Sequence, residues 1–379
     1  MRIVFVDGSD LKFDITSIDT EPLGGSQSAM FIVAEHIANS GHEVSIAARH
    51  FSSGFSRRGI SGIQLKDAMA GAIPGADIVI TLNFLLGPLD LRSAFGRSAL
   101  YIHWHQNDVF SPYGRKFSNP EFYRHVDHFI FASHWQANTF IGKYGLPCSR
   151  VTVIANPVSP HFVGLLPDSA PILAFKDPNL LYYASAPHRG LELLLTKVFP
   201  AIKANRPMLR LEVYSGFYLN QGMDFKDLAN IEKIIQMCKD SPGVDFCHGL
   251  PKVEFAERVK SAVMLCYPCS FRETSCMVAL EAMAAGCQLS VTAAGGIPET
   301  TAGHAKLTPI SMMPGDDRRF IYDVSTFVAN TLHLLDERER NPQGVENNLR
   351  RQVDHVTACH APAVIGSGWE RTLRCLAGN

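Results

Sequence analysis

The sequence predicts an α/β protein built from two doubly wound parallel sheets, each covered by helices on both faces. Short apolar runs alternate with longer segments of helical periodicity, which is typical of strands buried in a parallel sheet. The alternation stops at a segment with five prolines (157–178) and then restarts. With 379 residues, each half is long enough to bury its own core, so two domains are expected.

The first half begins with a strand and a long helix. Ile3–Val6 is a short apolar run, and Gly24–Ser40 carries apolar residues on and around one face, as a helix does. Further apolar runs predict the other strands of this sheet, at Glu43–Ala48, Asp77–Leu82, Leu100–Trp104, His128–Ala132 and Val151–Ile154.

The proline-rich segment predicts the entrance to a second domain, because proline removes a backbone donor and interrupts regular structure. We place the two domains at residues 1–158 and 159–359. Strands are then expected at Leu180–Ala184, Leu211–Tyr214, Val244–Cys247, Val263–Tyr267 and Leu289–Thr292. Helices are expected at Leu191–Ala204, Phe225–Lys239, Val253–Ser261, Ser275–Ala285 and Phe320–Leu335. Two such units in tandem would face a central cleft, where the carboxyl ends of the strands bind ligands.

Composition excludes several classes of protein. Hydrophobic residues make up 46% and charged residues 19%, which excludes wholesale disorder. The formal charge of −1 lacks the global basic excess of a dedicated nucleic-acid binder. No signal peptide or membrane-spanning run is evident, so we expect a cytoplasmic protein, with contact at the membrane surface left open.

The nine cysteines are expected to be reduced thiols in the core. Cys266 and Cys269 form a CxxC, but no second pair at zinc-binding spacing accompanies them. We interpret this CxxC as a buried strand and the turn after it, and we expect no metal site.

Two motifs of the first half follow predicted strands. Gly24 and Gly25 open a helix, where glycine permits close approach of a ligand and free N–H groups favour anions; an ordinary turn is the alternative. His103 and His105 end a strand and share one face. His105, followed by Gln106, is expected to be the more exposed, although most lone histidines are structural.

The second half contributes an arginine at a helix start. In YYASAPHRGLELLL, Arg189 precedes Gly190 between a strand and a helix. A guanidinium beside free N–H groups is suited to a diphosphate, and a surface arginine near a helix cap is an equally good interpretation.

Two glutamates with seven residues between them form the fourth motif, PCSFRETSCMVALEAMAAG. Glu273 stands at a strand-to-helix junction, and Glu281 lies about two turns along an apolar helix. A carboxylate in such a helix needs a partner, because buried charge is costly. The pair could accept hydrogen bonds from sugar and ribose hydroxyls, with Thr274 and Ser275 adding a phosphate site at the helix start. The alternative is a capping acid and a surface glutamate.

In this order the motifs resemble the retaining glycosyltransferases of GT-B fold, specifically glycosyltransferase family 4 (glycosyl transferases group 1). The resemblance is carried by the pair Glu273-x7-Glu281, by the AMAAG that follows it and by the later TAAGGIPE. Support comes from GGSQ, HFIFASHWQANTF, VIANPVSPHF and HRGLELLL, so the resemblance covers nearly the whole chain.

The resemblance implies roles for the candidate residues. Glu281 would bind the ribose of a nucleoside-diphosphate sugar, and Glu273 the hydroxyls of the donor sugar. Backbone groups of Thr274, Ser275 and Cys276 would lie near the sugar and phosphate. Gly24 and Gly25 would lie near the diphosphate and the acceptor. His105 would contact the donor sugar, and His103 is the second choice for that role.

The basic residues expected to bind the diphosphate, called the cationic clamp here, depart from the family pattern. An arginine followed by a Lys-Gly pair often holds the diphosphate in the family, whereas here Arg189-Gly190 occupies the Lys-Gly place. Ser185 stands roughly at the earlier arginine, so half of the clamp is missing or supplied elsewhere. Ser185 could still donate a hydrogen bond.

The GT-B fold also implies that the last helix returns to the first domain. In GWERTLRCL, Trp369, Leu373 and Leu376 share a helical face. We therefore assign 360–379 to the first domain; a terminal helix packed on its own domain is the alternative.

The expected activity is transfer of a hexose from a UDP- or GDP-linked sugar to the hydroxyl of a glycan, glycolipid or other acceptor, in cell-surface polysaccharide or glycoconjugate synthesis. His105, Arg189 and Glu273 would be catalytic, and no metal or other cofactor is expected. Acceptor loops are expected near 51–62 and 110–120. Their Arg57, Arg58, Arg115 and Lys116 would face anionic headgroups or charged glycans, or simply solvent.

Three alternatives remain. The first is a non-catalytic, nucleotide-binding regulatory partner, which the altered clamp favours. The second is a sugar-nucleotide epimerase or hydrolase on the same fold, which the two glutamates disfavour. The third, a nicotinamide dehydrogenase, lacks the GxGxxG fingerprint.

Overall fold

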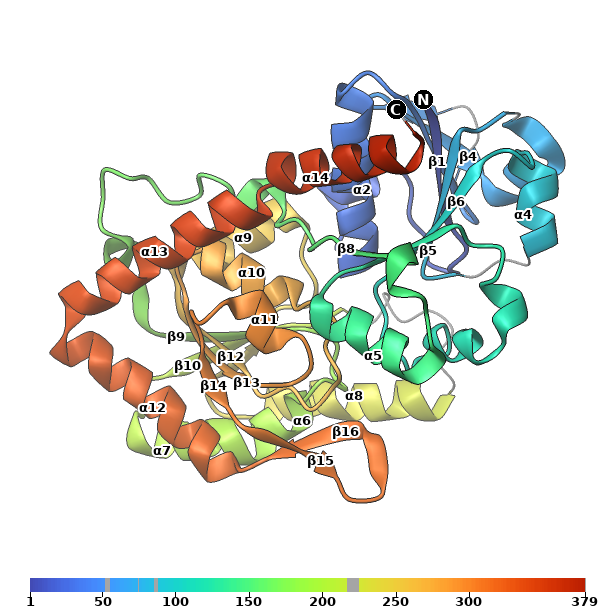
Figure 1. The fold of residues 1–379 in the computed structure, drawn as a ribbon. Helices are drawn as coiled ribbons and strands as arrows, with labels where there is room; N and C mark the ends of the chain where they lie inside the picture. The colour runs from blue at the N-terminus through green and yellow to red at the C-terminus, as the bar shows by residue number, and fades with distance from the viewer. Residues whose placement is uncertain (52–54, 74, 85–87, 217–224, 379) are drawn as a thin grey trace. The chain divides into compact units, whose positions relative to one another are not determined.

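The computed structural model describes residues 1–51, 55–73, 75–84, 88–216 and 225–378. The chain divides into two compact units (Figure 1). Unit 1 comprises Met1–Ser159 and His360–Asn379, and unit 2 comprises Pro160–Cys359. The division falls one residue after the boundary placed from the prolines.

Unit 1 contains, among its described residues, an eight-stranded sheet in the order β3-β4-β2-β1-β5-β6-β7-β8. Neighbouring strands pair in parallel except in the β3–β4 hairpin. Strands β2, β3 and β4 lie on one side of β1, and β5 to β8 follow in order on its other side. The strand order therefore reverses between β1 and β5. The strands are β1 Arg2–Asp7, β2 Glu43–Ala48, β3 Phe55–Arg57, β4 Ile60–Gln64, β5 Ile78–Leu82, β6 Leu100–His105, β7 His128–Phe131 and β8 Val151–Val153.

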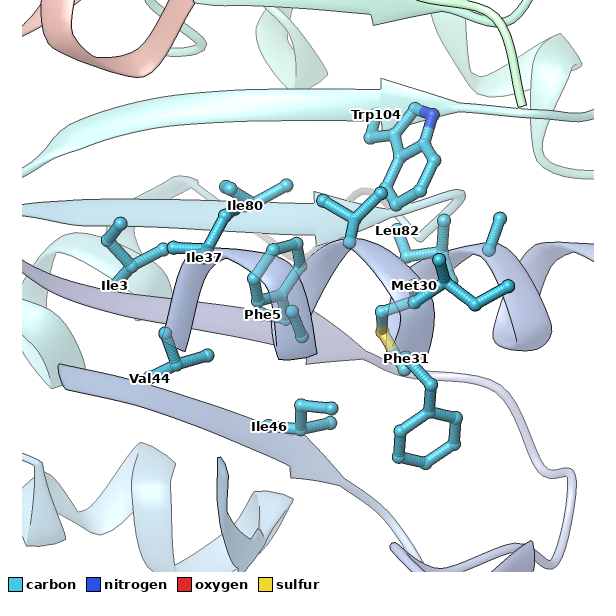
Figure 2. Close-up of a cluster of buried hydrophobic side chains, with 14 of the residues drawn as sticks. Ile3, Phe5, Met30, Phe31, Ile37, Val44, Ile46, Ile80, Leu82 and Trp104 are labelled. Atoms are coloured by element: carbon cyan, nitrogen blue, oxygen red, sulfur yellow. The ribbon is translucent and has the colours of Figure 1, made fainter. Parts of the chain in front are cut away.

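The core of unit 1 lies between this sheet and helix α2 (Gly25–Asn39), whose apolar side chains are almost completely buried. Figure 2 shows side chains of β1, β2, β5, β6 and α2 that meet there. Smaller clusters on the other face involve α4 (Pro88–Phe95) and α5 (His134–Tyr144). The short helical segments of unit 1 are α1 Ser17–Thr20, α3 Leu65–Asp67, η1 Ala68–Ala72, η2 Gly114–Ser118, η3 Pro120–Phe122 and η4 Cys148–Arg150.

The last helix, α14 (Pro362–Leu376), packs against α2 in unit 1 (Figure 1). Trp369 is fully buried, and its ring centroid lies 4.6 Å from that of Trp104 on β6. The backbone N–H of Val158 donates to the carbonyl of His360 at 2.8 Å, which joins the two segments of the unit. Unit 1 is therefore built from both ends of the chain.

Unit 2 contains, in its described part, a six-stranded parallel sheet in the order β11-β10-β9-β12-β13-β14. Every residue of β12 is buried, as expected for a central strand covered on both faces. A separate antiparallel hairpin pairs β15 (Ile310–Met313) with β16 (Asp316–Tyr322). The sheet strands are β9 Asp177–Ala184, β10 Arg210–Tyr214, β11 Val244–Phe246, β12 Ala262–Tyr267, β13 Gln288–Thr292 and β14 Lys306–Thr308.

Helices cover this sheet, and several of their bounds differ from those expected. Phe320–Tyr322 is strand rather than helix, because the Asp323 carboxylate accepts hydrogen bonds from the N–H groups of Ser325 and Thr326 and starts the helix there. The helix predicted at Leu191–Ala204 is interrupted by a π-helical turn. The helical segments are η5 Pro160–Phe162, η6 Ile172–Phe175, α6 Leu191–Leu193, η7 Leu194–Val198, α7 Phe199–Asn205, α8 Phe225–Asp240, α9 Lys252–Ser261, α10 Met277–Ala284, α11 Ile297–Thr301, α12 Val324–Arg340 and α13 Pro342–His360.

The proline-rich segment packs against the rest of unit 2. Leu166 and Ile172 are buried against Val345 and Leu349 of α13. All nine cysteines are free thiols, five of them buried, and Cys266 and Cys269 lie on β12 and in the turn after it as interpreted. Within the described ranges, no helix is both long and apolar enough to cross a bilayer.

Candidate functional site

The carboxyl edge of the unit 2 sheet gathers several predicted site residues. In this sheet the strand order reverses between β9 and β12. The chain continues from β9 to β10 and β11 on one side, and from β12 to β13 and β14 on the other. Ser185 follows β9 directly, and Glu273 lies in the loop after β12. In an open α/β sheet, ligands bind in the crevice outside the strand ends at such a reversal. The fold therefore places both residues at the position where a ligand site is expected.

Glu273 is buried but well compensated, with only 4% of its surface exposed. Its Oε1 accepts hydrogen bonds from Arg189 Nη1 at 2.8 Å and from the Tyr267 hydroxyl at 2.6 Å, and a weaker one from Cys269 Sγ at 3.7 Å. Among the described residues, no hydrogen bond reaches Oε2. One carboxylate oxygen thus fixes the orientation of the side chain, and the other remains available to a ligand.

Arg189 supplies the positive charge of the site. Its guanidinium forms the ion pair with Glu273 and lies 4.6 Å from the ring centroid of Phe271, with a third of the side chain exposed. Burial alone would lower the pKa of Arg189, but Glu273 outweighs it, so the pKa is raised and the arginine stays charged. Among the described residues, its one hydrogen bond uses Nη1. The remaining guanidinium donors are therefore not engaged by the described residues.

Two glycines allow the loops of this site to meet. Gly190 has φ +105°, and a Cβ on it would overlap the carbonyl oxygen of Pro268. Gly295 has φ +65°, and a Cβ on it would overlap the carbonyl oxygen of Glu273. Any other residue would meet both a backbone clash and an unfavourable φ at these positions. The glycines thereby hold the Arg189 and Glu273 loops in contact.

Ser185 joins the same hydrogen-bond network through Tyr267. Its hydroxyl lies 3.2 Å from the Tyr267 hydroxyl, which in turn donates to Glu273. The backbone N–H of Ser185 donates to the carbonyl of Tyr214 at 3.2 Å. Ser185, Tyr267, Glu273 and Arg189 therefore form one connected polar group.

The residues after Glu273 lead into α10. Thr274 and Cys276 are buried, and Ser275 is half-buried. The helix begins at Met277, two residues later than predicted, with Cys276 as its N-cap. The N–H of Cys276 donates to the Thr300 hydroxyl at 3.4 Å. This contact ties the loop to the helix that follows Gly296.

Glu281 has the partner that its apolar surroundings require. It is 2% exposed, and its Oε1 forms an ion pair with the ammonium group of Lys252, the first residue of α9. Lys252 is itself largely buried, with 16% of its side chain exposed. The sequence indicated that Glu281 needs a partner, but no spacing rule selects a lysine 29 positions earlier.

In unit 1, Gly24 is the N-cap of α2 and Gly25 its first residue, as predicted. The neighbouring Gln27 donates from Nε2 to Asp7 Oδ2 at 2.8 Å, which connects the helix start to the end of β1. Burial raises the pKa of Asp7, and the hydrogen bonds from Gln27 and Ser9 act in the opposite direction.

The expectation that His105 is exposed is wrong. His103 and His105 are both 0% exposed, and their rings contact Phe117, Phe131 and Phe140. His103 Nδ1 lies 2.8 Å from the Thr81 hydroxyl, and its Nε2 lies 3.1 Å from His105 Nδ1. Burial lowers the pKa of His103 to about 3 and that of His105 well below its usual value, so both imidazoles are neutral. The reason is that the aromatic side chains of η2 and α5 cover this end of β6.

Sequence reasoning missed three residues of the unit 2 site: Tyr267, Cys269 and Lys252. Tyr267 and Cys269 were assigned only to a strand and its turn, although both are hydrogen-bond donors adjacent to the Glu273 motif. Proximity in sequence is the signal that could have found these two. No cluster of histidine, cysteine, aspartate or glutamate side chains able to hold a metal occurs among the described residues.

Residues 169–331 match the family described as glycosyl transferases group 1. The matched segment lies within unit 2 and includes Ser185, Arg189, Glu273 and Glu281. This part of unit 2 is therefore similar to glycosyl transferases group 1, the family that the motifs resemble. No curated protein matches this chain.

Solved structures share the fold over nearly the entire chain. HepE from Anabaena, crystallised with UDP, has 15% identity and a TM-score of 0.66, covering 99% of this chain and 100% of HepE. Sucrose-phosphate synthase from Thermosynechococcus elongatus has 17% identity and a TM-score of 0.71, covering 99% of each chain. WaaG, a glycosyltransferase involved in lipopolysaccharide biosynthesis, has 17% identity and a TM-score of 0.66, covering 99% of this chain and 100% of WaaG. The predicted GT-B fold is confirmed; the assignment to family 4 stays a prediction.

Proposed function

We propose that this protein is a retaining glycosyltransferase that moves a hexose from a nucleoside-diphosphate sugar to an acceptor hydroxyl. The observation that carries the proposal is the Arg189–Glu273 ion pair, held at 2.8 Å at the carboxyl edge of the unit 2 sheet. It presents a charged guanidinium and a carboxylate oxygen side by side, and these suit a diphosphate and a sugar hydroxyl respectively. The match of this segment to glycosyl transferases group 1 supports the same interpretation.

The donor is best sought first among UDP sugars, with GDP sugars as the second choice. HepE was crystallised with UDP, with UDP and glucose, and with UDP-glucose. On this chain, Glu281 would accept hydrogen bonds from the ribose hydroxyls. Arg189 would bind the diphosphate, with Ser185 and the backbone of Thr274, Ser275 and Cys276 beside it, and Glu273 Oε2 would bind the donor sugar. Gly24 and Gly25, at the start of α2 in unit 1, are proposed as further ligand-binding residues.

In the proposed reaction, the bond from the anomeric carbon to the diphosphate oxygen breaks, and a bond to the acceptor oxygen forms on the same face. The leaving phosphate oxygen takes the proton of the acceptor hydroxyl, so no protein nucleophile is required. Arg189 would stabilise the charge that develops on the diphosphate as the bond breaks. No metal or other cofactor is part of this proposal. Placement in cell-surface polysaccharide or glycoconjugate synthesis is likewise proposed.

The first test is nucleotide binding, measured as the change in melting temperature with UDP, GDP and ADP. A ligand at 100 times its dissociation constant stabilises the protein by about 2.7 kcal/mol. We expect a shift with one base, lost in Glu281→Gln and retained in Arg350→Gln. Arg350 is a matched control because it is a partly buried arginine of unit 2, ion-paired with Asp168 at 3.3 Å.

The second test is turnover of UDP-glucose, or of the GDP sugar if GDP binds, with and without a panel of hydroxyl acceptors. Removing one preorganised donor to a developing anion typically costs about 100-fold or more in rate. We expect a loss of this size in Arg189→Gln and no loss in Arg350→Gln. If a nucleotide binds and no donor is turned over, the protein is instead a non-catalytic nucleotide-binding partner. If no nucleotide binds, the proposed function is wrong.

A further inference from the structure

Tyr267 is the last residue of β12, and its hydroxyl lies within the polar group at the carboxyl edge of the unit 2 sheet. The residue is 0% exposed, so it acts on a bound ligand only through the residues that it contacts. Burial raises the pKa of Tyr267 well above its usual value, and the nearby Cys269 and Glu273 act in the same direction. The hydroxyl therefore stays protonated and has a single hydrogen to donate.

That hydrogen is donated to Glu273. The hydroxyl oxygen lies 2.6 Å from Glu273 Oε1, and an ionised carboxylate only accepts hydrogen bonds. The Ser185 hydroxyl lies 3.2 Å from the same tyrosine oxygen, whose hydrogen is already used. Ser185 is therefore the donor in that contact. The hydrogen bonds run in one direction, from Ser185 through Tyr267 to Glu273.

The other polar groups of Ser185 are engaged as well. Its backbone N–H donates to the carbonyl of Tyr214 at 3.2 Å, and its carbonyl accepts from the Ser215 hydroxyl at 2.7 Å. Because its hydroxyl hydrogen goes to Tyr267, Ser185 has no donor left for a diphosphate in this arrangement. The serine at the first position of the cationic clamp therefore does not replace an arginine there.

Tyr267 decides which oxygen of Glu273 stays available. Arg189 and Tyr267 both donate to Oε1, at 2.8 and 2.6 Å, and the described residues leave Oε2 without a donor. An arginine beside a carboxylate readily pairs with both of its oxygens, because the two groups are planar forks of matching width. A second donor on Oε1, fixed by a buried strand residue, holds the carboxylate in the one-oxygen arrangement. Without that donor, Arg189 is free to take both oxygens.

We propose that Tyr267 is a positioning residue that keeps Glu273 Oε2 directed to the donor sugar, and that Ser185 acts through Tyr267 rather than by donating to the diphosphate. This inference rests on the proposed function, in which Glu273 Oε2 binds the donor sugar. Neither Tyr267 nor Ser185 needs to touch the reacting atoms. Their contribution is orientation, and misplacing a positioned group by a small distance can cost about 100-fold in rate.

The test measures kcat and KM for UDP-glucose and the dissociation constant of UDP, with the GDP pair instead if GDP is the nucleotide that binds. Tyr267→Phe removes only the hydroxyl. We expect kcat/KM to fall about 30-fold, mainly in kcat. The dissociation constant of UDP should change by less than about threefold, because UDP has no sugar to orient and Arg189 keeps further donors for the diphosphate. An unchanged kcat/KM overturns the positioning role.

Tyr214→Phe is the matched control. Tyr214 ends β10, is 5% exposed and donates its hydroxyl to the buried Glu212, so the variant removes the same kind of hydrogen bond elsewhere in unit 2. We expect it to lower the melting temperature as Tyr267→Phe does and to change kcat/KM by less than about twofold. An equal loss of kcat/KM in the two variants would mean that loosening of unit 2 causes it, and would overturn the assignment.

Ser185→Ala tests the direction of the hydrogen bonds. In the wild type it should lower kcat/KM about threefold and leave the affinity for UDP unchanged. In the Tyr267→Phe background it should have no further effect, because residues that act through one another are not additive. A Ser185 hydroxyl that donates to the diphosphate predicts instead a loss of UDP affinity of about tenfold in both backgrounds. That result would overturn the assignment of Ser185.

The wild-type protein separates this inference from the proposed function. If it turns over the donor and Tyr267→Phe matches it, the inference fails and the proposed function stands. If it binds UDP but turns over no donor, the transferase proposal fails, and Tyr267→Phe must then weaken UDP-glucose more than UDP; equal weakening of the two ligands overturns the inference. If no nucleotide binds, both fail.

Discussion

The polar residues at the carboxyl edges of the two sheets are held in opposite electrostatic states. In unit 1, His103 and His105 end β6, are fully buried among phenylalanine rings and are neutral. In unit 2, Glu273 follows β12 and Glu281 lies on α10, and each buried carboxylate is paired with a cation. The histidines and Glu273 all lie at or just beyond the carboxyl end of a parallel strand, but the neighbouring elements differ. Aromatic side chains on η2 and α5 exclude water in unit 1, whereas the loop after β9 and the start of α9 bring charges in unit 2.

The difference teaches how a buried ionisable group is accommodated. An imidazole can lose its proton and stay in an apolar site at modest cost, but a carboxylate in a ligand site must keep its charge and needs a counter-ion. Packing therefore favours a structural role for the histidines, and ion pairing favours a binding role for the glutamates. Three predictions can break or sharpen this comparison.

The largest expected effect comes from removing the counter-ion of Glu281. Lys252→Met leaves that carboxylate buried and unpaired, which should lower the free energy of unfolding by about 3 kcal/mol. The double variant Lys252→Met/Glu281→Gln should recover most of the loss, because no charge then remains to compensate. Urea unfolding followed by far-ultraviolet circular dichroism measures the change.

Tryptophan fluorescence provides an internal control for that experiment. All three tryptophans, Trp104, Trp135 and Trp369, lie in unit 1. The fluorescence transition should therefore stay in place while the dichroism transition shifts. A double variant as unstable as Lys252→Met alone would contradict the role of Lys252 as counter-ion.

The second prediction concerns acid. In the folded state the pKa of His103 is about 3 and that of His105 is well below its usual value, whereas the unfolded chain binds protons near pH 6.5. The stability that the two neutral histidines contribute is therefore fully present above pH 6.5. It is lost as the pH falls from 6.5 toward their pKa values in the folded protein. Between pH 6.5 and 5, His103 should lower the free energy of unfolding by about 2 kcal/mol, and His105 should add a further decrease in the same direction.

Tryptophan fluorescence at a series of pH values measures this loss in unit 1. A variant with His103→Phe and His105→Phe should show a correspondingly smaller decrease over the same interval. Equal decreases in the variant and the wild type would mean that the histidines are accessible to protons in the folded protein.

The smallest expected effect tests whether His105 is catalytic. His105→Phe replaces the imidazole with a somewhat larger aromatic ring and removes the hydrogen bond to His103. If packing is its role, kcat/KM for the donor sugar should change by less than about twofold per folded molecule, a difference of under about 0.5 kcal/mol in the barrier. A loss of about 100-fold with unchanged nucleotide affinity would instead restore the catalytic role implied by the family resemblance.

Much of the fold could be predicted because its signal is local. Apolar runs such as Val263–Tyr267 identified buried strands, and the motif around Glu273 pointed to candidate residues, of which Glu273, Arg189 and Ser185 lie together in unit 2. The helix start differs from the predicted Phe320 for a local reason too, since Asp323 is the N-cap and the helix begins after it. Exposure of His105 could not be predicted, because the rings that cover it come from residues 117, 131 and 140.

By itself the sequence determined the α/β class, the two-part organisation and the Glu273 and Glu281 positions, since periodicity and motif spacing are properties of neighbouring residues. Only the tertiary structure decided which groups meet: Lys252 with Glu281, Arg189 with Glu273, and His105 with phenylalanine rings. Charge state and burial depend on these long-range contacts. Tertiary contacts therefore decide whether a buried ionisable side chain is paired with a counter-ion or packed in its neutral form.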